Sequence, residues 1–363
     1  MVPVFDMHCD TIALIESCRI QSERAKKNLP YSGGIFFSVS EEELKNGISF
    51  RENTRMIDAK RLKQSNYICQ CLALCSSKRA AEAAGVTPWE YLRLLSDSFD
   101  RVCEQNADLV RPVTSIAETE KCFREGRVPV LKTIEDSAAL EGDPDRLQQM
   151  YRCGVRVVGF TWNFENAVAF GHKYVTDPKT GERYLEVDDV NGLKPAGFAF
   201  TEAMEQMGIL MDISHLNDAG IRDVFATVKP STPVIATHSN ARALCAHPRN
   251  LPDDFLRAIA DHGGLTGLNF CHEFLNPACI RDRHKFSHVS DMVEHIKYIK
   301  NVTGIDAIGL GSDFDGITSD VEFYGCGEIH ALAEGMEKAG FTDDEIEKVF
   351  YRNALRVFRD VIG

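Results

Sequence analysis

The stretch Val2-Pro3-Val4-Phe5-Asp6-Met7-His8-Cys9-Asp10 is a short apolar run that ends in a histidine and an aspartate. Four later apolar runs also end in side chains of metal-binding types, namely Glu135, His215, His238 and Asp313. Continuous apolar runs of this length are typical of strands buried on both faces of a parallel sheet. Polar side chains at the carboxyl ends of such strands are where a (β/α)8 barrel places its chemistry. The pattern therefore predicts a metal-dependent hydrolase.

Eight apolar segments of strand length recur along the chain, with helical patterns between most of them. They cover residues 2–8, 67–74, 128–135, 155–161, 208–214, 233–238, 264–270 and 307–313. Strands that alternate with helices predict a parallel sheet, and eight repeats predict that the sheet closes on itself. We therefore expect an α/β fold, a (β/α)8 TIM-type barrel, in one domain over residues 1–363.

Two stretches are expected to be additions near the mouth of the barrel. Residues 16–66 hold a basic, polar segment followed by Tyr31-Ser32-Gly33-Gly34. Residues 172–197 hold Asp177-Pro178-Lys179-Thr180-Gly181, a turn signal between two short β-like pieces. Because the second stretch follows the fourth predicted strand, it should lie on the active-site face as a lid.

The composition excludes several classes of protein. A formal charge of −13 argues against nucleic acid or an anionic membrane surface as a partner. The apolar stretches all fall short of the ~20 residues that a membrane-spanning helix needs. The 12 cysteines form neither zinc-ribbon pairs nor a regular framework, so we expect free thiols and a cytoplasmic location. Barrels of this kind often dimerise, and the sequence is compatible with a homodimer.

The five runs supply a set of ligands for metal ions. His8 and Asp10 are two residues apart, so on a strand their side chains point the same way. His215 or His238 alone would more often be an ordinary buried histidine. Three histidines and two carboxylates at the same level of four strands instead predict a shared site. Imidazole and carboxylate ligands suit zinc.

Glu135 is the expected bridge between two zinc ions, because one carboxylate can hold two cations about 3.5–4 Å apart. We expect the first zinc on His8, Asp10 and Glu135, and the second on Glu135, His215 and His238. A carbamylated Lys132 is the competing bridge. Lys132 is three residues from Glu135, so on a regular strand it faces the other side, and Asp136 has the same difficulty.

Two further residues are candidates for catalysis and substrate binding. Asp313 ends the eighth strand and could pass a proton from the attacking water to a leaving amine. Asp315 shares its parity, but before Gly316 it is better explained as a turn residue. A zinc-bound water titrates near ~7, so a hydroxide that bridges the two ions is the expected nucleophile. Arg249 follows the strand of His238 closely enough for its guanidinium to form two hydrogen bonds with a substrate carboxylate.

At this point the chain resembles the membrane (renal) dipeptidase family of zinc peptidases. The resemblance spans essentially the whole chain and rests on six motifs in the same order. These are Phe5-Asp6-Met7-His8-Cys9-Asp10-Thr11, Ile134-Glu135, Asp212-Ile213-Ser214-His215, Thr237-His238-Ser239-Asn240, Pro248-Arg249-Asn250-Leu251-Pro252-Asp253-Asp254 and Gly311-Ser312-Asp313-Phe314-Asp315-Gly316. Related barrels usually open with His-x-His, so Asp10 favours the dipeptidases.

The resemblance implies hydrolysis of dipeptides that have a free C-terminal carboxylate, often with tolerance of a C-terminal D-residue. The family's two-zinc pattern falls on His8, Asp10, Glu135, His215 and His238. Its proton-handling aspartate matches Asp313, and its arginine for the dipeptide carboxylate matches Arg249. Some relatives also open β-lactams.

Two positions depart from the animal enzymes of the family. Trp162 stands where they carry a histidine, and Cys271 stands where a pocket tyrosine is expected. We expect both to line the substrate site and to affect rate and specificity. The remaining histidines, among them His172 and His247, are expected to be surface or helix-packing residues. The alternatives are another binuclear amidohydrolase, acting on a cyclic amide or an N-acyl amino acid, and a metal-binding protein without catalysis.

Overall fold

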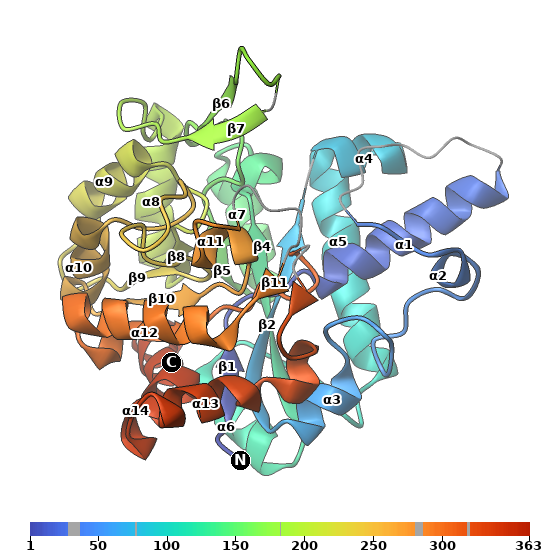
Figure 1. Cartoon of the computed structure of the whole chain (residues 1–363). Coiled ribbons are helices and arrows are strands. Elements are labelled where there is room, and N and C mark those ends of the chain that lie inside the picture. The colour runs from blue at the N-terminus through green and yellow to red at the C-terminus, as the bar shows by residue number, and fades with distance from the viewer. Residues whose placement is uncertain (28–36, 77, 182, 280–285, 318–319) are drawn as a thin grey trace.

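A closed barrel of eight parallel strands lies at the centre of the computed structural model (Figure 1). The structure describes residues 1–363 except 28–36, 77, 182, 280–285 and 318–319. The barrel strands are β1 (Val4–Asp6), β2 (Tyr67–Cys75), β4 (Val128–Glu135), β5 (Val155–Gly159), β8 (Leu210–Asp212), β9 (Val234–Ala236), β10 (Leu265–Leu268) and β12 (Ile308–Leu310). The ring closes because β2 pairs with both β1 and β4, so the predicted (β/α)8 barrel is confirmed.

Each of the eight predicted segments contains one barrel strand, although several strands are shorter than predicted. A further strand, β3 (Val110–Val113), was missed. It pairs with the first half of β4, Val128–Leu131, outside the ring of eight. Its four residues include Pro112, which cannot donate to a sheet, so the segment lacks the pattern of a buried strand.

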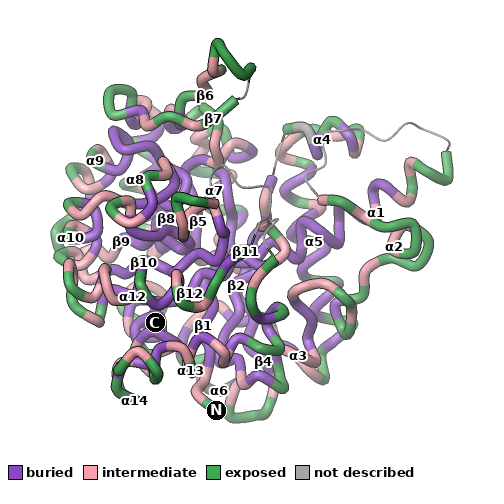
Figure 2. The backbone as a smooth tube through the Cα atoms, in the orientation of Figure 1, coloured by how far each residue is buried: buried purple, intermediate pink, exposed green. Residues whose placement is uncertain are grey.

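The residues at the centre of the molecule are buried, as the purple tube in Figure 2 shows. Every residue of β4 is buried, as expected for a strand covered on both faces. Close backbone contacts occur where β9, β10 and β12 end. A Cβ atom at Gly311 would lie 1.7 Å from the Thr237 carbonyl oxygen, and one at Gly267 would lie 2.0 Å from it. Only glycine allows these neighbouring segments to approach so closely.

Helices cover the outside of the barrel. They are α1 (Thr11–Lys26), α2 (Glu41–Asn46), α3 (Ala59–Gln64), α4 (Lys78–Ala84), α5 (Pro88–Gln105), α6 (Ile116–Arg124), α7 (Pro144–Arg152), α8 (Pro195–Met207), α9 (Asp218–Thr227), α10 (Asp253–Asp261), α11 (His272–Leu275), α12 (Val289–Thr303), α13 (His330–Lys338), α14 (Asp343–Glu347) and α15 (Asn353–Ile362). Short turns of other helix types are η1 (Ser137–Leu140), η2 (Ile305–Ala307), η3 (Gly325–Glu328) and η4 (Lys348–Arg352).

An antiparallel hairpin, β6 (Lys173–Thr176) with β7 (Arg183–Glu186), stands above the barrel in Figure 1. The other side of the molecule carries α1 and α2, which project away from the strands in the same view. A second small pairing joins β11 (Phe286–Ser287) to β13 (Asp320–Val321). The predicted loop Tyr31-Ser32-Gly33-Gly34 lies outside the described residues.

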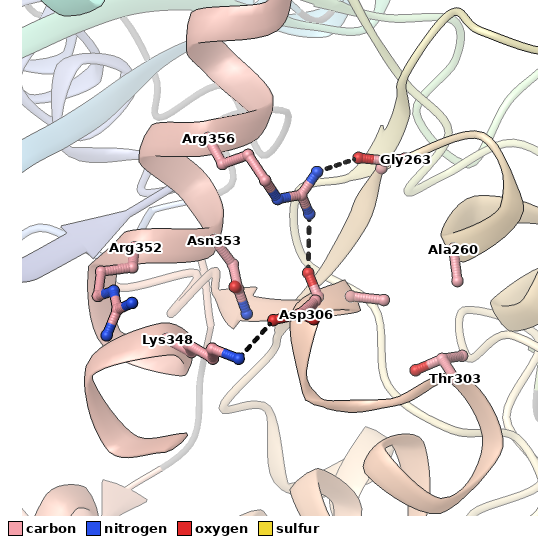
Figure 3. Close-up of a pocket in the computed structure, with 10 residues that line it drawn as sticks. Ala260, Gly263, Thr303, Asp306, Lys348, Arg352, Asn353 and Arg356 are labelled. Atoms are coloured by element: carbon pink, nitrogen blue, oxygen red, sulfur yellow. Dashed lines mark hydrogen bonds and ion pairs between the residues drawn. The ribbon is translucent and has the colours of Figure 1, made fainter. Parts of the chain in front are cut away.

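The last helices pack against the end of the barrel where the strands begin. There they line a hollow of about 510 Å³, shown in Figure 3. Arg356 donates to the carbonyl oxygens of Gly263 (2.7 Å) and Asp306 (2.9 Å), and Lys348 pairs with the Asp306 carboxylate at 3.0 Å. Arg352, also in the wall, pairs with Asp344 at 2.6 Å. These cations bind groups of the protein itself, so the hollow joins the final helices to the barrel, and its described lining residues offer no unpaired cation to a ligand.

Two further expectations can be compared with the structure. All 12 cysteines are free thiols, which agrees with the absence of a disulfide framework in the sequence. Among the helices that the structure describes, none has both the length and the apolar character needed to cross a membrane.

Candidate metal centre and substrate pocket

The carboxyl ends of the barrel strands bring the predicted ligands together at one rim. His8 and Asp10 follow β1, Glu135 ends β4, and His215 and His238 follow β8 and β9. All five are buried, with exposed fractions of 0–8%. Side chains that are far apart in the sequence therefore share a single buried space, because parallel strands end on the same side of the barrel.

The Glu135 carboxylate lies at the middle of this group. Its Oε1 atom is 2.8 Å from His215 Nε2, 3.6 Å from His238 Nε2 and 3.9 Å from His8 Nε2. His8 Nε2 is also 3.6 Å from Asp10 Oδ2. One carboxylate oxygen thus stands within 4 Å of all three imidazole nitrogens, which is the geometry expected of a bridging ligand.

The donor set fits divalent cations. The buried atoms His8 Nε2 and Asp10 Oδ1 make no hydrogen bond to any described residue, which is costly unless another partner is bound. Burial also raises the pKa of Glu135 well above its usual range, and the nearby Asp10 carboxylate adds to this effect. Buried carboxylates that repel one another are stabilised by positive charge, and a metal ion supplies it.

The histidines differ in their electrostatic surroundings. Burial lowers the pKa values of His215 and His238 well below the usual range, so both are neutral, the state that ligates a metal. At His8, burial alone would lower the pKa, but the carboxylates of Glu135, Asp10 and Asp313 raise it to about 10. The charge around His8 therefore favours a cation at that place.

Two polar side chains that the sequence did not reveal orient the histidine rings. Asn163 Oδ1 is 2.9 Å from His215 Nδ1, and Thr237 Oγ1 is 2.8 Å from His238 Nδ1. A partner on one ring nitrogen directs the other nitrogen to the metal, as is usual in metal sites. The sequence does place Asn163 beside Trp162 and Thr237 beside His238, but adjacency alone predicts no contact.

Asp313 stands at the edge of the same group. Its Oδ1 is 3.9 Å from His8 Nε2, and its Oδ2 accepts a hydrogen bond from Asn269 Nδ2 at 3.0 Å. The backbone is left-handed here, with φ of 60°, a conformation that aspartate tolerates better than most residues. Burial, opposed in part by His8, raises the pKa of Asp313 to about 7. A carboxyl with such a pKa can both accept and donate a proton near neutral pH.

The alternative residues considered from the sequence lie elsewhere. Lys132 points away from Glu135, and its Nζ donates to Ser96 Oγ and Asp100 Oδ1, both at 2.9 Å. The parity argument against a Lys132 bridge is thereby confirmed. Asp315 accepts from Thr11 Oγ1 at 2.7 Å and from a backbone N–H at 2.9 Å, which agrees with a structural role.

A pocket of about 230 Å³ opens onto the ligands. Its lining includes Asp10, Glu135, His215 and Asp313 together with Trp162, Asn163, Leu185, His247, Arg249, Cys271, Glu273, Phe274, Gly316 and Ile317. The three residues expected at the substrate site, Trp162, Arg249 and Cys271, are therefore all in its wall. Leu185 comes from β7, so the hairpin contributes to the pocket.

Arg249 is the only arginine or lysine among the described residues that line this pocket. The side chain is only 3% exposed. Its Nη1 donates to the Ser214 carbonyl oxygen, whereas Nε and Nη2 make no hydrogen bond to a described residue. Burial lowers the pKa of Arg249 to about 10, so the guanidinium is still charged at neutral pH. A buried cation with two unused donors is suited to a carboxylate.

Two histidines that were interpreted as surface or helix-packing residues lie close to the pocket. His247 lines the pocket and packs its ring 4.5 Å from that of Phe274, so it is not a surface residue. His172 is buried, and burial together with the charge of Arg249 lowers its pKa to about 3. Cys75 also lies by the ligands, with its sulfur within 4.8 Å of carboxylate oxygens of Asp10 and Glu135. Register explains this, because Cys75 pairs with Glu135 across β2 and β4.

Comparisons with known proteins identify the family of the chain. A family model described as membrane dipeptidase, peptidase family M19, matches residues 1–362. An uncharacterized protein in the pqqA 5′ region of Klebsiella pneumoniae is 33% identical over 275 residues, which cover 75% of this chain and 95% of that protein. Dipeptidase aclJ of Aspergillus oryzae is 31% identical over 273 residues, which cover 73% of this chain and 60% of that protein.

Solved structures share the fold. A metallopeptidase from Rhodobacter sphaeroides, bound to a phosphinate mimic of the dipeptide L-Ala-D-Ala, aligns with a TM-score of 0.81 and 23% identity over 99% of both chains. The probable dipeptidase PvdM from Pseudomonas aeruginosa aligns with a TM-score of 0.74 and 19% identity, over 85% of this chain and 90% of that one. At such identities the likeness establishes the barrel fold alone.

Proposed function

The chain belongs to the membrane dipeptidase family, peptidase family M19, and on that premise we propose that it hydrolyses dipeptides with a free C-terminal carboxylate. Members of this family are metal-dependent hydrolases. The finer assignment concerns the ions, the residue that binds the substrate carboxylate and the residue that moves protons.

Two zinc ions are the proposed cofactors. His8, Asp10 and Glu135 would hold the first, and Glu135, His215 and His238 the second. The distances of 2.8–3.9 Å from Glu135 Oε1 to the three imidazole nitrogens support this sharing of ligands. When bound, such a pair of ions lowers the pKa of a coordinated water and polarises a carbonyl.

The observation that carries the choice of substrate is the state of Arg249. Two of its donors, Nε and Nη2, are buried in the pocket wall without a described partner. A substrate carboxylate would accept both in a forked pair and would remove the cost of burying them unbonded. Because Arg249 is 3% exposed, a peptide that continued past this carboxylate would have to pass through the wall. The site therefore favours a substrate whose chain ends at Arg249.

Asp313 is the proposed proton carrier. Its carboxyl would accept a proton from the attacking water and pass it to the departing amine. Asn269 holds one carboxyl oxygen, and burial places the pKa near 7, so both protonation states are accessible. The water oxygen adds to the carbonyl carbon and gives a tetrahedral intermediate with a negative oxygen. The C–N bond then breaks as the carbonyl re-forms, and the nitrogen takes the proton from Asp313 and leaves as the amine.

Trp162 and Cys271 are proposed to shape the pocket around the peptide. The Trp162 ring centroid is 5.8 Å from that of His215, one of the proposed metal ligands. An indole N–H can donate to a developing oxyanion but cannot exchange a proton. We also assign residues 1–363 to one domain with additions at about 16–66 and 172–197, of which the second supplies Leu185 to the pocket wall.

A panel of small dipeptides tests the proposal. Zinc-loaded protein should cleave L-Ala-L-Ala or L-Ala-D-Ala, should lose the activity with a chelator, and should spare the same dipeptides when they are N-acetylated. Cleavage of the N-acetylated compounds instead would indicate another amidohydrolase reaction. Failure to cleave any of them by protein that carries two zinc ions would refute the dipeptidase assignment.

A further inference from the structure

A buried hydrogen-bond network lies behind His238, on the side away from the pocket. Its centre is Asp212, the last residue of β8, which is 5% exposed. Asp212 Oδ1 accepts from the backbone N–H groups of Ser214 (3.0 Å) and Thr237 (2.9 Å) and from the Ser214 hydroxyl (2.5 Å). Asp212 Oδ2 accepts from the Thr237 hydroxyl at 2.6 Å. Four donors therefore converge on one carboxylate.

The network determines where the proton of the Thr237 hydroxyl lies. The Thr237 hydroxyl has three polar neighbours, Asp212 Oδ2 at 2.6 Å, His238 Nδ1 at 2.8 Å and Ser214 Oγ at 3.1 Å. The carboxylate oxygen is the nearest of the three and only accepts, so the single hydroxyl proton points at Asp212 Oδ2. The lone pair of the same oxygen then faces His238 Nδ1 at 2.8 Å and can only accept from it. A neutral imidazole carries one N–H, which must be on Nδ1. The lone pair of His238 is thereby left on Nε2, 3.6 Å from Glu135 Oε1.

We propose that Asp212, acting through Thr237, is a positioning residue that fixes the tautomer of His238 and so sets the cation affinity of the position formed by His215 and His238. This inference rests on the proposed metal centre but is independent of the dipeptide substrate. His215 is oriented by the Asn163 side chain, which has no carboxylate behind it among the hydrogen bonds of the described residues. Asp212 therefore acts on one of the two metal positions.

The orientation of the network predicts an unusual effect of Asp212→Asn. Two backbone N–H groups bind the Oδ1 position, so the amide oxygen must take that place and the amide NH2 must face Thr237. The NH2 group would donate to the Thr237 oxygen and turn the hydroxyl proton toward His238 Nδ1, which at 2.8 Å is nearer than Ser214 Oγ at 3.1 Å. His238 would then carry its N–H on Nε2, where it blocks a metal ion. Asp212→Asn should therefore weaken binding of the second zinc ion more than Thr237→Val, which only removes the hydroxyl.

A second carboxylate of the barrel offers a matched control. Asp6 accepts from the Ser312 N–H (2.9 Å) and hydroxyl (2.5 Å) in the same manner. The Ser312 hydroxyl also accepts from the Phe314 N–H at 3.2 Å and lies 3.2 Å from the His8 carbonyl oxygen, so it contacts no ring nitrogen. Ser312→Ala thus removes a comparable buried hydroxyl without touching the imidazole proton.

The experiment measures zinc stoichiometry and affinity by competition with a chelator, and the His238 tautomer by ¹⁵N NMR of the metal-free protein. We expect Thr237→Val to bind the second zinc ion, at the position of His215 and His238, about 10–100-fold more weakly. This is the range found when a partner of a metal-bound histidine is removed. Thr237→Ser should restore the wild-type affinity for the second zinc ion, and Ser312→Ala should leave that affinity unchanged. Asp212→Asn should show the Nε2–H tautomer and the weakest second zinc, and the addition of Thr237→Val should relieve that loss.

Each outcome bears on the proposal. The proposal would be overturned if His238 kept its proton on Nδ1 in Asp212→Asn. It would also be overturned if the double variant, Asp212→Asn with Thr237→Val, bound the second zinc ion more weakly than Asp212→Asn alone. Equal losses in Ser312→Ala and Thr237→Val would also overturn it, since they would show a general packing effect. Wild-type protein that binds fewer than two zinc ions would instead refute the proposed metal centre, while the NMR measurement would still report the tautomer.

Discussion

Replacement of Arg249 by alanine should reveal how much of the substrate affinity comes from its two unused donors. Each charge-assisted hydrogen bond contributes about 1.5–3 kcal/mol. Two such bonds from Nε and Nη2 would contribute about 3–6 kcal/mol if each reaches a carboxylate oxygen. Because about 1.4 kcal/mol corresponds to a factor of ten, kcat/KM for a dipeptide should fall by about 10²–10⁴. The loss should lie chiefly in KM, since the carboxylate is bound in both ground and transition states.

The alanine variant also removes the bond from Nη1 to the Ser214 carbonyl oxygen, so a structural effect has to be separated from substrate binding. The assay therefore compares a dipeptide with the same dipeptide amidated at its C-terminus, in both proteins. Wild-type protein should strongly prefer the free acid. Arg249→Ala should cleave acid and amide with nearly equal kcat/KM, because the group that distinguishes them is gone.

Two results would refute this reasoning. A variant that still prefers the free acid by the wild-type factor would show that another group binds the carboxylate. Wild-type protein that cleaves acid and amide equally would show that no carboxylate is bound at all. Zinc content and Tm are measured on both proteins, so that a loss of metal or of stability is not mistaken for a loss of binding.

The remaining predictions concern the ligands and their surroundings. Removal of zinc by a chelator should lower Tm reversibly, by an amount corresponding to about 2.7 kcal/mol or more if the free zinc had been 100 times its Kd; an unchanged Tm would argue against tight binding. Asp313→Asn should lower kcat by about 10²–10⁴ with two zinc ions retained, as measured by steady-state kinetics and metal analysis; a normal kcat would exclude its role in proton transfer. Gly316→Ala would place a Cβ 2.1 Å from Asp10 Oδ2 and 2.4 Å from Asp313 Oδ1, so zinc content and activity should fall and unfolding should become easier by about 1–3 kcal/mol. The matched Gly327→Ala, whose Cβ would first meet the flexible Arg61 side chain at 3.2 Å, should retain zinc and activity; equal effects in both variants would contradict the steric argument.

Much of the barrel could be predicted because its signal is local and repeated. Buried parallel strands are read from short apolar runs, and eight such runs separated by helices leave few alternatives to closure. Strand β3 was not predicted, because its four residues include a proline and do not form a continuous apolar run. The strand ends were uncertain by a few residues, as with the predicted segment 208–214 and the observed β8, Leu210–Asp212.

The set of candidate ligands was also within reach of the sequence. His8 and Asp10 were placed on one face by the two-residue repeat of a strand, and the same repeat placed Lys132 away from Glu135, where it meets Ser96. The groups that surround and orient these ligands could not be predicted from the sequence. Asn163 and Thr237 look like ordinary loop residues, and His172 and His247 were interpreted as surface or helix-packing residues although both are near Arg249.

The sequence by itself determined the barrel, the family and the set of candidate ligands, because periodicity and order along the chain are enough for these. Only the tertiary structure decided which atoms face one another across strands. The unpaired donors of Arg249, the approach of Cys75 to Glu135 and the path from Asp212 through Thr237 to His238 depend on register and side-chain direction. Those are properties of segments that are distant in sequence, and they arise when the sheet closes and brings the strand ends to one rim.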